Sequence, residues 1–214
     1  MTPVAIPETQ KKVKDPLAEL TAQVRYYKSL GFPVPMGIKE PDSMENPVLV
    51  NYGLSLEDVE KKLGIMVSLC GCKTNHQDLH HPFHQWGWIY RVDLGRKTRG
   101  WPPERAEEYQ RSHHLDRLKF AEGMAAFIKE SMFWQKEFEQ NGHDSYAARK
   151  LARIKVLRVI GESECNNFIP HFIGSQCVVC QKAPALYLNG DLKVIYFQIS
   201  QNPCWGIGYK QKFS

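Results

Sequence analysis

The feature that most constrains this chain is a run of four side chains, Cys165, His171, Cys177 and Cys180, spaced as Cys-x5-His-x5-Cys-x2-Cys. Thiolate and imidazole are the ligands of structural zinc sites, which hold the ion in a tetrahedron, and the two-residue spacer of a CxxC turn lets both cysteines reach one ion. The run therefore predicts a structural zinc site made by these four residues.

The same run is also compatible with core packing or with redox chemistry. Free cysteine is among the most buried residue types, so the thiols could pack as small apolar groups around His171 as a core histidine. A CxxC pair can also be a redox centre, but such pairs usually sit at a helix N-terminus, which lowers the thiol pKa. Here a β-rich segment follows Cys180, so the sequence favours metal over redox chemistry.

A second dense group of candidate ligands lies earlier in the chain and contains two thiols and four imidazoles, at Cys70, Cys72, His76, His80, His81 and His84. A helical turn in this stretch would place successive ligands on one side. We therefore expect a second zinc, held by Cys70, Cys72, His76 and His80. Core packing accounts for the CxC pair equally well if it lies on a strand, where both side chains share a face.

The two groups could also share one ion, with Cys177 and Cys180 joined by two histidines of the 76–84 run. A third arrangement of the six cysteines is disulfide pairing, but no Asn-x-Ser/Thr site accompanies them and four of the six sit in CxC and CxxC pairs near histidines. Metal binding is the better interpretation. Whether there are two sites or one is left open.

Composition and targeting signals favour an intracellular location, cytoplasmic or nuclear. The chain has no apolar run of about 18 residues, and its first residues do not resemble a signal peptide, so we expect no membrane partner. The formal net charge of +5 makes an anionic partner plausible without identifying one.

Local patterns predict two short helices and a linker in the first third of the chain. Residues Pro16 to Leu30 carry apolar side chains at helical spacing, and a proline-rich segment follows at 32–46. A brief apolar run comes before a helix over Leu56 to Leu63, where Ser55 and Asp58 resemble a capping box. We divide the chain into an N-terminal helix with its linker, 1–54, and a single zinc-binding domain, 55–214.

The rest of the chain predicts an α+β fold, with central long helices and zinc-braced β-hairpins on either side of them in sequence. Strand-like segments at 65–70 and 86–94 suggest the first hairpin, joined by the histidine-rich stretch. A long helix is expected over about 104–140 and another over about 144–160. The second hairpin surrounds Asn189-Gly190, the dipeptide that suits a type I′ turn.

Two basic patches suggest a nucleic-acid partner. The first combines cations with an aromatic ring, at Arg96, Lys97, Arg99 and Trp101, and the second lies on the helix predicted at 144–160, at Arg149, Lys150, Arg153 and Arg158. Cationic side chains neutralise phosphates and exposed aromatic rings stack on bases. The plainer alternative for each patch is an ordinary loop or a solvated helix face.

No catalytic motif supports an enzymatic function: GxxxxGK[ST], GxSxG, HExxH and the HxE…PCxxC pattern are all missing. The sequence therefore predicts a zinc-stabilised binding protein whose partner is RNA, DNA or a nucleoprotein assembly. Two alternatives are a protein-interaction adaptor, docking through residues 32–47 and the aromatic Trp205, Tyr209 and Phe213, and a zinc-dependent hydrolase.

Overall fold

The computed structural model describes residues 16–43, 45–68, 85–140, 169–177, 179–189, 191–198 and 205–211. Over these residues the fold is α+β, the class that the sequence predicts. The described helices are α1 (Pro16–Ser29), α2 (Leu56–Leu63), α3 (Pro103–Ser112) and α4 (Phe120–Gln140), with a short 3-10 turn over Ile173–Ser175.

Nine described strands form three separate sheets. The five-stranded sheet has the order β2-β7-β6-β5-β8, in which β2–β7 and β5–β8 are parallel and the other pairs antiparallel. Two antiparallel ribbons, β1–β3 and β4–β9, complete the set. The strands are β1 (Val48–Asn51), β2 (Met66–Ser68), β3 (Trp86–Ile89), β4 (Leu115–Arg117), β5 (Ile169–His171), β6 (Lys182–Asn189), β7 (Asp191–Gln198), β8 (Trp205–Ile207) and β9 (Tyr209–Gln211).

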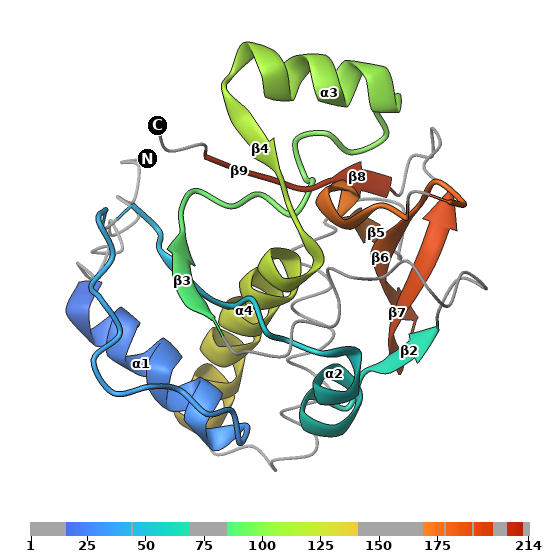
Figure 1. Ribbon diagram of the computed structural model, residues 1–214. Coiled ribbons are helices and arrows are strands. Elements are labelled where there is room, and N and C mark those ends of the chain that lie inside the picture. The colour runs from blue at the N-terminus through green and yellow to red at the C-terminus, as the bar shows by residue number, and fades with distance from the viewer. Residues whose placement is uncertain are drawn as a thin grey trace, which may run out of the picture.

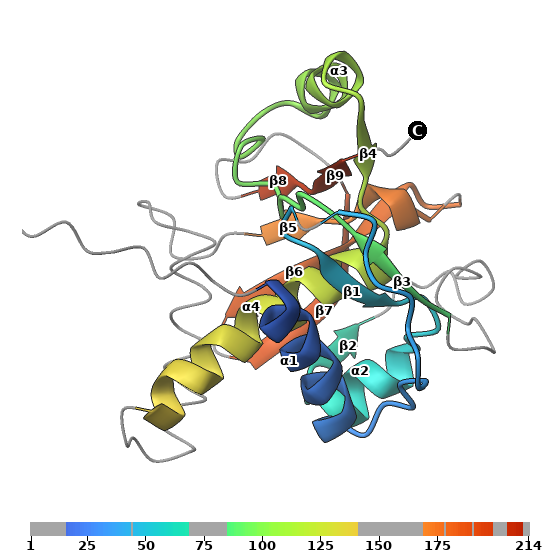
Figure 2. The same cartoon turned by 90° about the vertical axis from the view of Figure 1, so that its left-hand side faces the viewer.

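Helix α4 lies at the centre of the described part of the molecule. Figures 1 and 2 show it between the five-stranded sheet on one side and the β1–β3 ribbon with α1 on the other. Every residue from 120 to 129 is buried, as expected for a helix that is covered all round. Met124 and Phe127 pack in one cluster with Leu49 of β1 and Leu186 of β6, so α4 joins the two sides.

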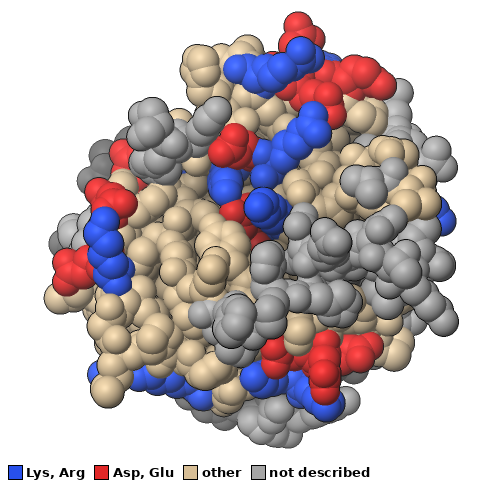
Figure 3. Space-filling model, viewed as in Figure 1, with Lys and Arg blue, Asp and Glu red and all other residues tan. Residues whose placement is uncertain are grey.

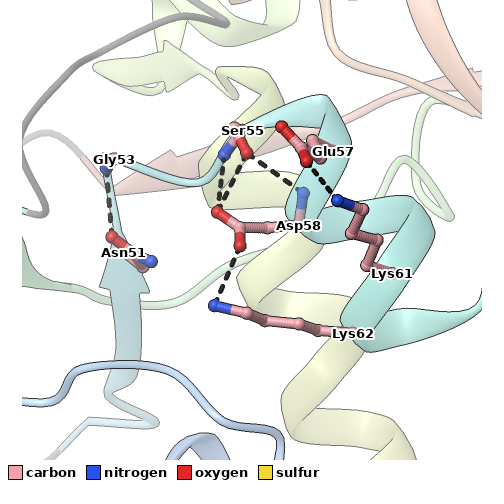
Figure 4. Close-up of polar contacts among 7 residues, drawn as sticks. All are labelled: Asn51, Gly53, Ser55, Glu57, Asp58, Lys61 and Lys62. Atoms are coloured by element: carbon pink, nitrogen blue, oxygen red, sulfur yellow. Dashed lines mark hydrogen bonds and ion pairs between the residues drawn. The ribbon is translucent and has the colours of Figure 1, made fainter.

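Helix α2 has the ends that its sequence predicts (Figure 4). The Ser55 hydroxyl accepts a hydrogen bond from the Asp58 backbone N–H at 3.0 Å, and the Asp58 carboxylate accepts one from the Ser55 backbone N–H at 3.5 Å. Asp58 also pairs with Lys62 at 2.9 Å. Gly64 ends the helix with a φ of +63°, a conformation that costs glycine little. The predicted capping box is confirmed.

Helix α1 is tied to the strand that follows the proline-rich segment. The Gln23 amide donates to the Pro47 carbonyl at 3.0 Å and accepts from the Leu49 N–H at 2.9 Å, while the Tyr27 hydroxyl donates to the Leu49 carbonyl at 3.0 Å. Tyr27 and Leu49 belong to the same buried cluster as Met124. Residues on both sides of position 54 therefore contribute to one core.

The hairpin predicted between 65 and 94 is wrong. Both strands exist, as β2 and β3, but they do not pair with each other: β2 lies parallel to β7, and β3 lies antiparallel to β1. β-branched and aromatic content identifies a segment that suits a sheet, but it does not identify the partner strand. Here each of the two segments pairs with a strand from a different part of the chain.

The continuous helix predicted over 104–140 is also wrong. Helix α3 ends at Ser112, His114 takes a φ of +52°, and residues 115–117 form β4 before α4 begins at Phe120. The apolar side chains Leu115 and Leu118 fit helical spacing, but the β4 segment instead pairs with β9, nearly a hundred residues away in sequence. Tertiary pairing overrides the local pattern at this point. The helix predicted over 144–160 lies outside the described residues.

The hairpin predicted around Asn189-Gly190 is confirmed as β6–β7, but its turn differs. A two-residue type I′ turn would pair Leu188 with Asp191. The register instead pairs Leu188 with Leu192 and Asn189 with Asp191, and Gly190 itself lies outside the described residues.

Candidate nucleic-acid interface and metal ligands

His171 is the candidate metal ligand that the structure places most fully. It lies on β5 between β6 and β8, is 1% exposed, and its ring stacks at a tilt on Trp205 with the centroids 4.9 Å apart. Its Nδ1 lies 3.0 Å from the Ile169 carbonyl, which can only accept, so Nδ1 carries the proton. Burial lowers the pKa of His171 to about 4 against the opposing effect of this hydrogen bond. The imidazole is neutral at pH near 7, the form that can bind a metal through Nε2.

Cys177 and Cys180 lie in a tight turn that leads directly into β6. The Cys177 N–H donates to the Lys182 carbonyl at 2.8 Å, and the Gln181 N–H donates to the Cys177 carbonyl at 2.9 Å. Gln181 takes a φ of +57° within this turn. Cys177 is buried and Cys180 is partly buried against the main core. A strand rather than a helix follows the pair, so the helix N-terminus typical of redox CxxC motifs is missing at this turn.

The described residues hold no group of three or more His, Cys, Asp or Glu side chains that could bind a metal ion. His171, Cys177 and Cys180 therefore do not form a three-ligand group by themselves. Cys165 lies outside the described residues, and so do Cys70, Cys72, His76 and His80, whose positions would decide whether a fourth ligand joins the first group or a second site exists. The zinc sites stay a prediction.

The first basic patch lies on a loop over residues 95–101 that is fastened to β8. The buried Thr98 hydroxyl donates to the Ile207 carbonyl at 2.8 Å and accepts from the Ile207 N–H at 2.9 Å. The Gly100 N–H donates to the Trp205 carbonyl at 2.8 Å. Gly95, at a φ of +103°, lies so close to the Gly206 backbone that a Cβ would collide with it. This loop is held in one position by its backbone contacts.

The loop brings one cation, Lys97, and one aromatic ring, Trp101, against one side of α3. The Arg105 guanidinium stacks over the Trp101 ring at 4.3 Å from the ring centroid, and the Lys97 ammonium lies 4.9 Å from the centroid of Tyr109. The Trp101 and Tyr109 rings meet edge to face with centroids 5.6 Å apart. We call these four residues, Lys97, Trp101, Arg105 and Tyr109, the cation–aromatic cluster.

Two further rings extend this cluster. The Tyr109 ring lies 4.0 Å from the ring of His113, centroid to centroid, and 5.8 Å from that of Tyr209. His113 is exposed at the end of α3, whereas Tyr209 is buried beneath it. Burial raises the pKa of Tyr209, and the nearby Asp93 carboxylate raises it further, so this phenol stays neutral.

The predicted basic residues are only partly brought together. Lys97 and Trp101 join the cluster, while Arg96 is exposed and Arg99 is partly buried on the same loop. The second patch, at Arg149, Lys150, Arg153 and Arg158, lies outside the described residues. Sequence reasoning missed Arg105 and Tyr109, although their spacing of four residues, and that of Trp101 and Arg105, marks one side of a helix start.

The residues expected to dock a protein partner differ in their exposure to solvent. Within residues 32–47, Met36 is 96% exposed, whereas Phe32 and Val34 are buried in the core. Trp205 is partly buried and Tyr209 is buried. Phe213 lies outside the described residues. Of the helices that the structure describes, none is long and apolar enough to cross a membrane.

No protein-family model, curated protein or solved structure matches this chain.

Proposed function

We propose that this chain is a zinc-braced binding protein that takes RNA or DNA in single-stranded form. The proposal rests on the geometry of the cation–aromatic cluster. Its two ring systems and two cations come from one fixed loop and one helix, so they form a surface with a set geometry.

Single strands suit this chemistry because their bases are free to stack. Stacking of a base on an aromatic side chain contributes about 1–3 kcal/mol, and the neighbouring cations attract the phosphates on either side. The Arg105 guanidinium already lies over the Trp101 ring, so a base that stacks at this place meets a cation that is held near it at little further cost in side-chain entropy.

Zinc has a separate role in the proposal, which is to brace the fold. The CxxC turn at Cys177 and Cys180 and the neutral, hydrogen-bonded imidazole of His171 have the local chemistry of zinc ligands. Both features adjoin the five-stranded sheet whose β8 strand fastens the loop of the cation–aromatic cluster. A metal at this sheet would hold the binding surface in place without contacting the nucleic acid.

The binding proposal is tested with fluorescein-labelled single-stranded RNA and DNA, by fluorescence anisotropy at several salt concentrations. We expect measurable affinity for single strands that weakens with salt, and about tenfold or greater loss in Trp101→Ala and in Arg105→Glu, from lost stacking and reversed charge. Lys28→Glu, an equal charge reversal on the exposed end of α1, is the matched control. Equal effects of Arg105→Glu and Lys28→Glu would show general attraction to a basic protein rather than this surface.

The zinc proposal is tested by elemental analysis of freshly prepared, reduced protein. We expect up to two zinc ions per chain, with one lost in Cys177→Ser and, if the sites are separate, a different one lost in Cys72→Ser. Cys165→Ser should behave like Cys177→Ser. Protein that folds and contains no zinc would refute this part of the proposal while leaving the oligonucleotide result unaffected.

A further inference from the structure

A pocket of about 350 Å³ lies under α3, between that helix, β4 and β9. Its wall includes Gln110 and Arg111 of α3, and it is separate from the cation–aromatic cluster. Residues 107, 110 and 111 lie on a different side of the helix from 105 and 109, because the α-helix repeats every 3.6 residues. The pocket is therefore a feature distinct from the proposed nucleic-acid surface.

Positive charge predominates in the wall of this pocket. Four cations line it, Arg111, Arg117, Lys119 and Lys210, against the two carboxylates Glu107 and Asp116. Figure 3 shows Lys and Arg side chains running from α3 down to the middle of this face, with acidic side chains among them. The net charge of the lining favours an anionic occupant.

Two of the four cations are held by acidic partners. Arg117 pairs with Glu107 at 2.8 Å, and Lys210 pairs with Glu122, which is 1% exposed at the start of α4. Glu122 also accepts hydrogen bonds from the Tyr52 hydroxyl at 3.0 Å and the Lys119 backbone N–H at 2.9 Å. These contacts fix one side of the pocket to the central helix.

The other two cations, Arg111 and Lys119, have no acidic partner among the residues that the structure describes. Both are exposed. An exposed cation without a partner is ordinary by itself. Two of them on the rim of one pocket make a site where a single phosphate could accept from both.

Gln110 supplies a second, independent observation. Gln110 is one of the residues that line the pocket and is 3% exposed, yet neither its amide nitrogen nor its amide oxygen, both buried, has a hydrogen-bond partner among the described residues. Buried polar atoms nearly always have partners, so an unsatisfied amide indicates a missing one. A flexible glutamine side chain can turn this amide toward a ligand in the pocket, and the amide needs a group that both donates and accepts, as a hydroxyl does.

We propose that this pocket binds a small phosphate ester that carries hydroxyl groups, such as a sugar phosphate. The phosphate lies between Arg111 and Lys119, and a hydroxyl of the ester pairs with the Gln110 amide. This site goes beyond the proposed nucleic-acid surface and does not depend on it.

Isothermal titration calorimetry of the full chain with ribose 5-phosphate, inorganic phosphate and ribose tests the ligand class. We expect ribose 5-phosphate to bind more tightly than inorganic phosphate, because only the ester brings hydroxyls to Gln110, and ribose to give no signal. No binding of ribose 5-phosphate, or equal binding of ribose and its phosphate, would overturn the proposal.

Variants then test the residues. Arg111→Gln and Lys119→Gln should each weaken ribose 5-phosphate binding about tenfold, as expected for the loss of one charge-assisted hydrogen bond. Lys28→Gln removes the same charge from α1 and should leave the affinity unchanged. If all three variants lose affinity equally, the attraction is general and the pocket is not the site. Oligonucleotide binding by Arg111→Gln should match that of Lys28→Gln, which separates this result from the proposed function.

Gln110→Met keeps the length of the side chain and removes the amide. We expect its melting temperature to equal or exceed that of the natural chain, because an unsatisfied buried amide is gone. The affinity of this variant for ribose 5-phosphate should fall to the affinity that the natural chain has for inorganic phosphate. A purely structural Gln110 would change the melting temperature and leave the affinity for the ester unaltered, and that outcome would contradict its assignment to the site.

Discussion

Gly123 is buried within α4, where the ring of Phe172 packs directly against its backbone. Glycine is a poor helix residue, and replacing it with alanine in an exposed helix stabilises the protein by about 1 kcal/mol. Here the added Cβ would overlap the Phe172 ring, which is fully buried, so the ring or the helix would have to shift. The local preference of the helix and the packing of the core therefore oppose each other at this residue.

We predict that Gly123→Ala destabilises the fold by about 1–2 kcal/mol, since an overpacked core typically costs about 1–3 kcal/mol and the gain in helix propensity offsets part of it. Urea unfolding measures the change. The same substitution in a Phe172→Leu background should cost less, because the smaller side chain leaves room for the Cβ. A stabilising effect of Gly123→Ala in the natural chain would contradict this packing.

His171 makes the stability of the zinc-free protein depend on pH. Burial lowers its folded pKa to about 4, while an unfolded histidine titrates near about 6.5. Below about pH 6.5 the unfolded state binds the extra proton, so the stability present at higher pH is lost as the pH falls toward about 4. Between about pH 7.5 and about pH 5 we expect a loss of about 2 kcal/mol from this residue.

Urea unfolding of chelator-treated protein at the two pH values measures this loss. His171→Gln, which has no titrating group, is the matched control and should lose about 2 kcal/mol less over the same range. Identical pH dependence of the two proteins would show that His171 is not buried in its neutral form.

At the scale of elements, long-range backbone contacts decide where segments begin and end. The β4 segment interrupts what would otherwise read as one helix because Leu115 and Arg117 pair with β9. The loop over 95–101 keeps its shape because Thr98 both donates to and accepts from Ile207 of β8. The cation–aromatic cluster depends on this second contact, since the loop carries Lys97 and Trp101.

We predict that Thr98→Val destabilises the protein by about 1–3 kcal/mol, because the nearly isosteric change leaves a buried Ile207 N–H without its acceptor. It should also weaken oligonucleotide binding, since the loop is released from β8. Thermal unfolding and anisotropy measure the two effects. Thr21→Val is the control, because the Thr21 hydroxyl donates to the Leu17 carbonyl within an exposed helix turn, a local contact four residues away. Loss of stability without any loss of binding would show that the loop does not need this anchor.

At the scale of the whole molecule, one buried cluster joins segments that the sequence assigns to different parts. Tyr27 of α1 and Leu49 of β1 pack with Met124 of the central helix. Lys129, 4% exposed on α4, pairs with Glu19 of α1 at 2.7 Å and donates to the Pro47 carbonyl at 2.8 Å. Removal of the N-terminal segment would expose α4 and take these two contacts away from the Lys129 charge.

We predict that residues 55–214 do not fold by themselves. Tyr27, Leu49 and Val50 are nearly or fully buried, and each contributes about 1.5–3 kcal/mol of burial, so their loss alone is comparable to the stability of a typical domain, about 5–15 kcal/mol. The full chain should unfold in urea in one transition, and the 55–214 fragment in none. A cooperative transition of the fragment would contradict this prediction and support the division at position 54.

Local features whose causes lie within a few residues could be predicted from the sequence alone. These include the capping box of α2, the glycine that ends it, the turn at Cys177 and Cys180 before a hairpin, and the α+β class. Three features could not be predicted in this way: which strands pair, where the long helical pattern breaks, and that Arg105 and Tyr109 join the basic loop. The physical reason is that strand pairing and burial depend on partners far away in the chain, which no local pattern contains, whereas caps and turns are satisfied by their own neighbours.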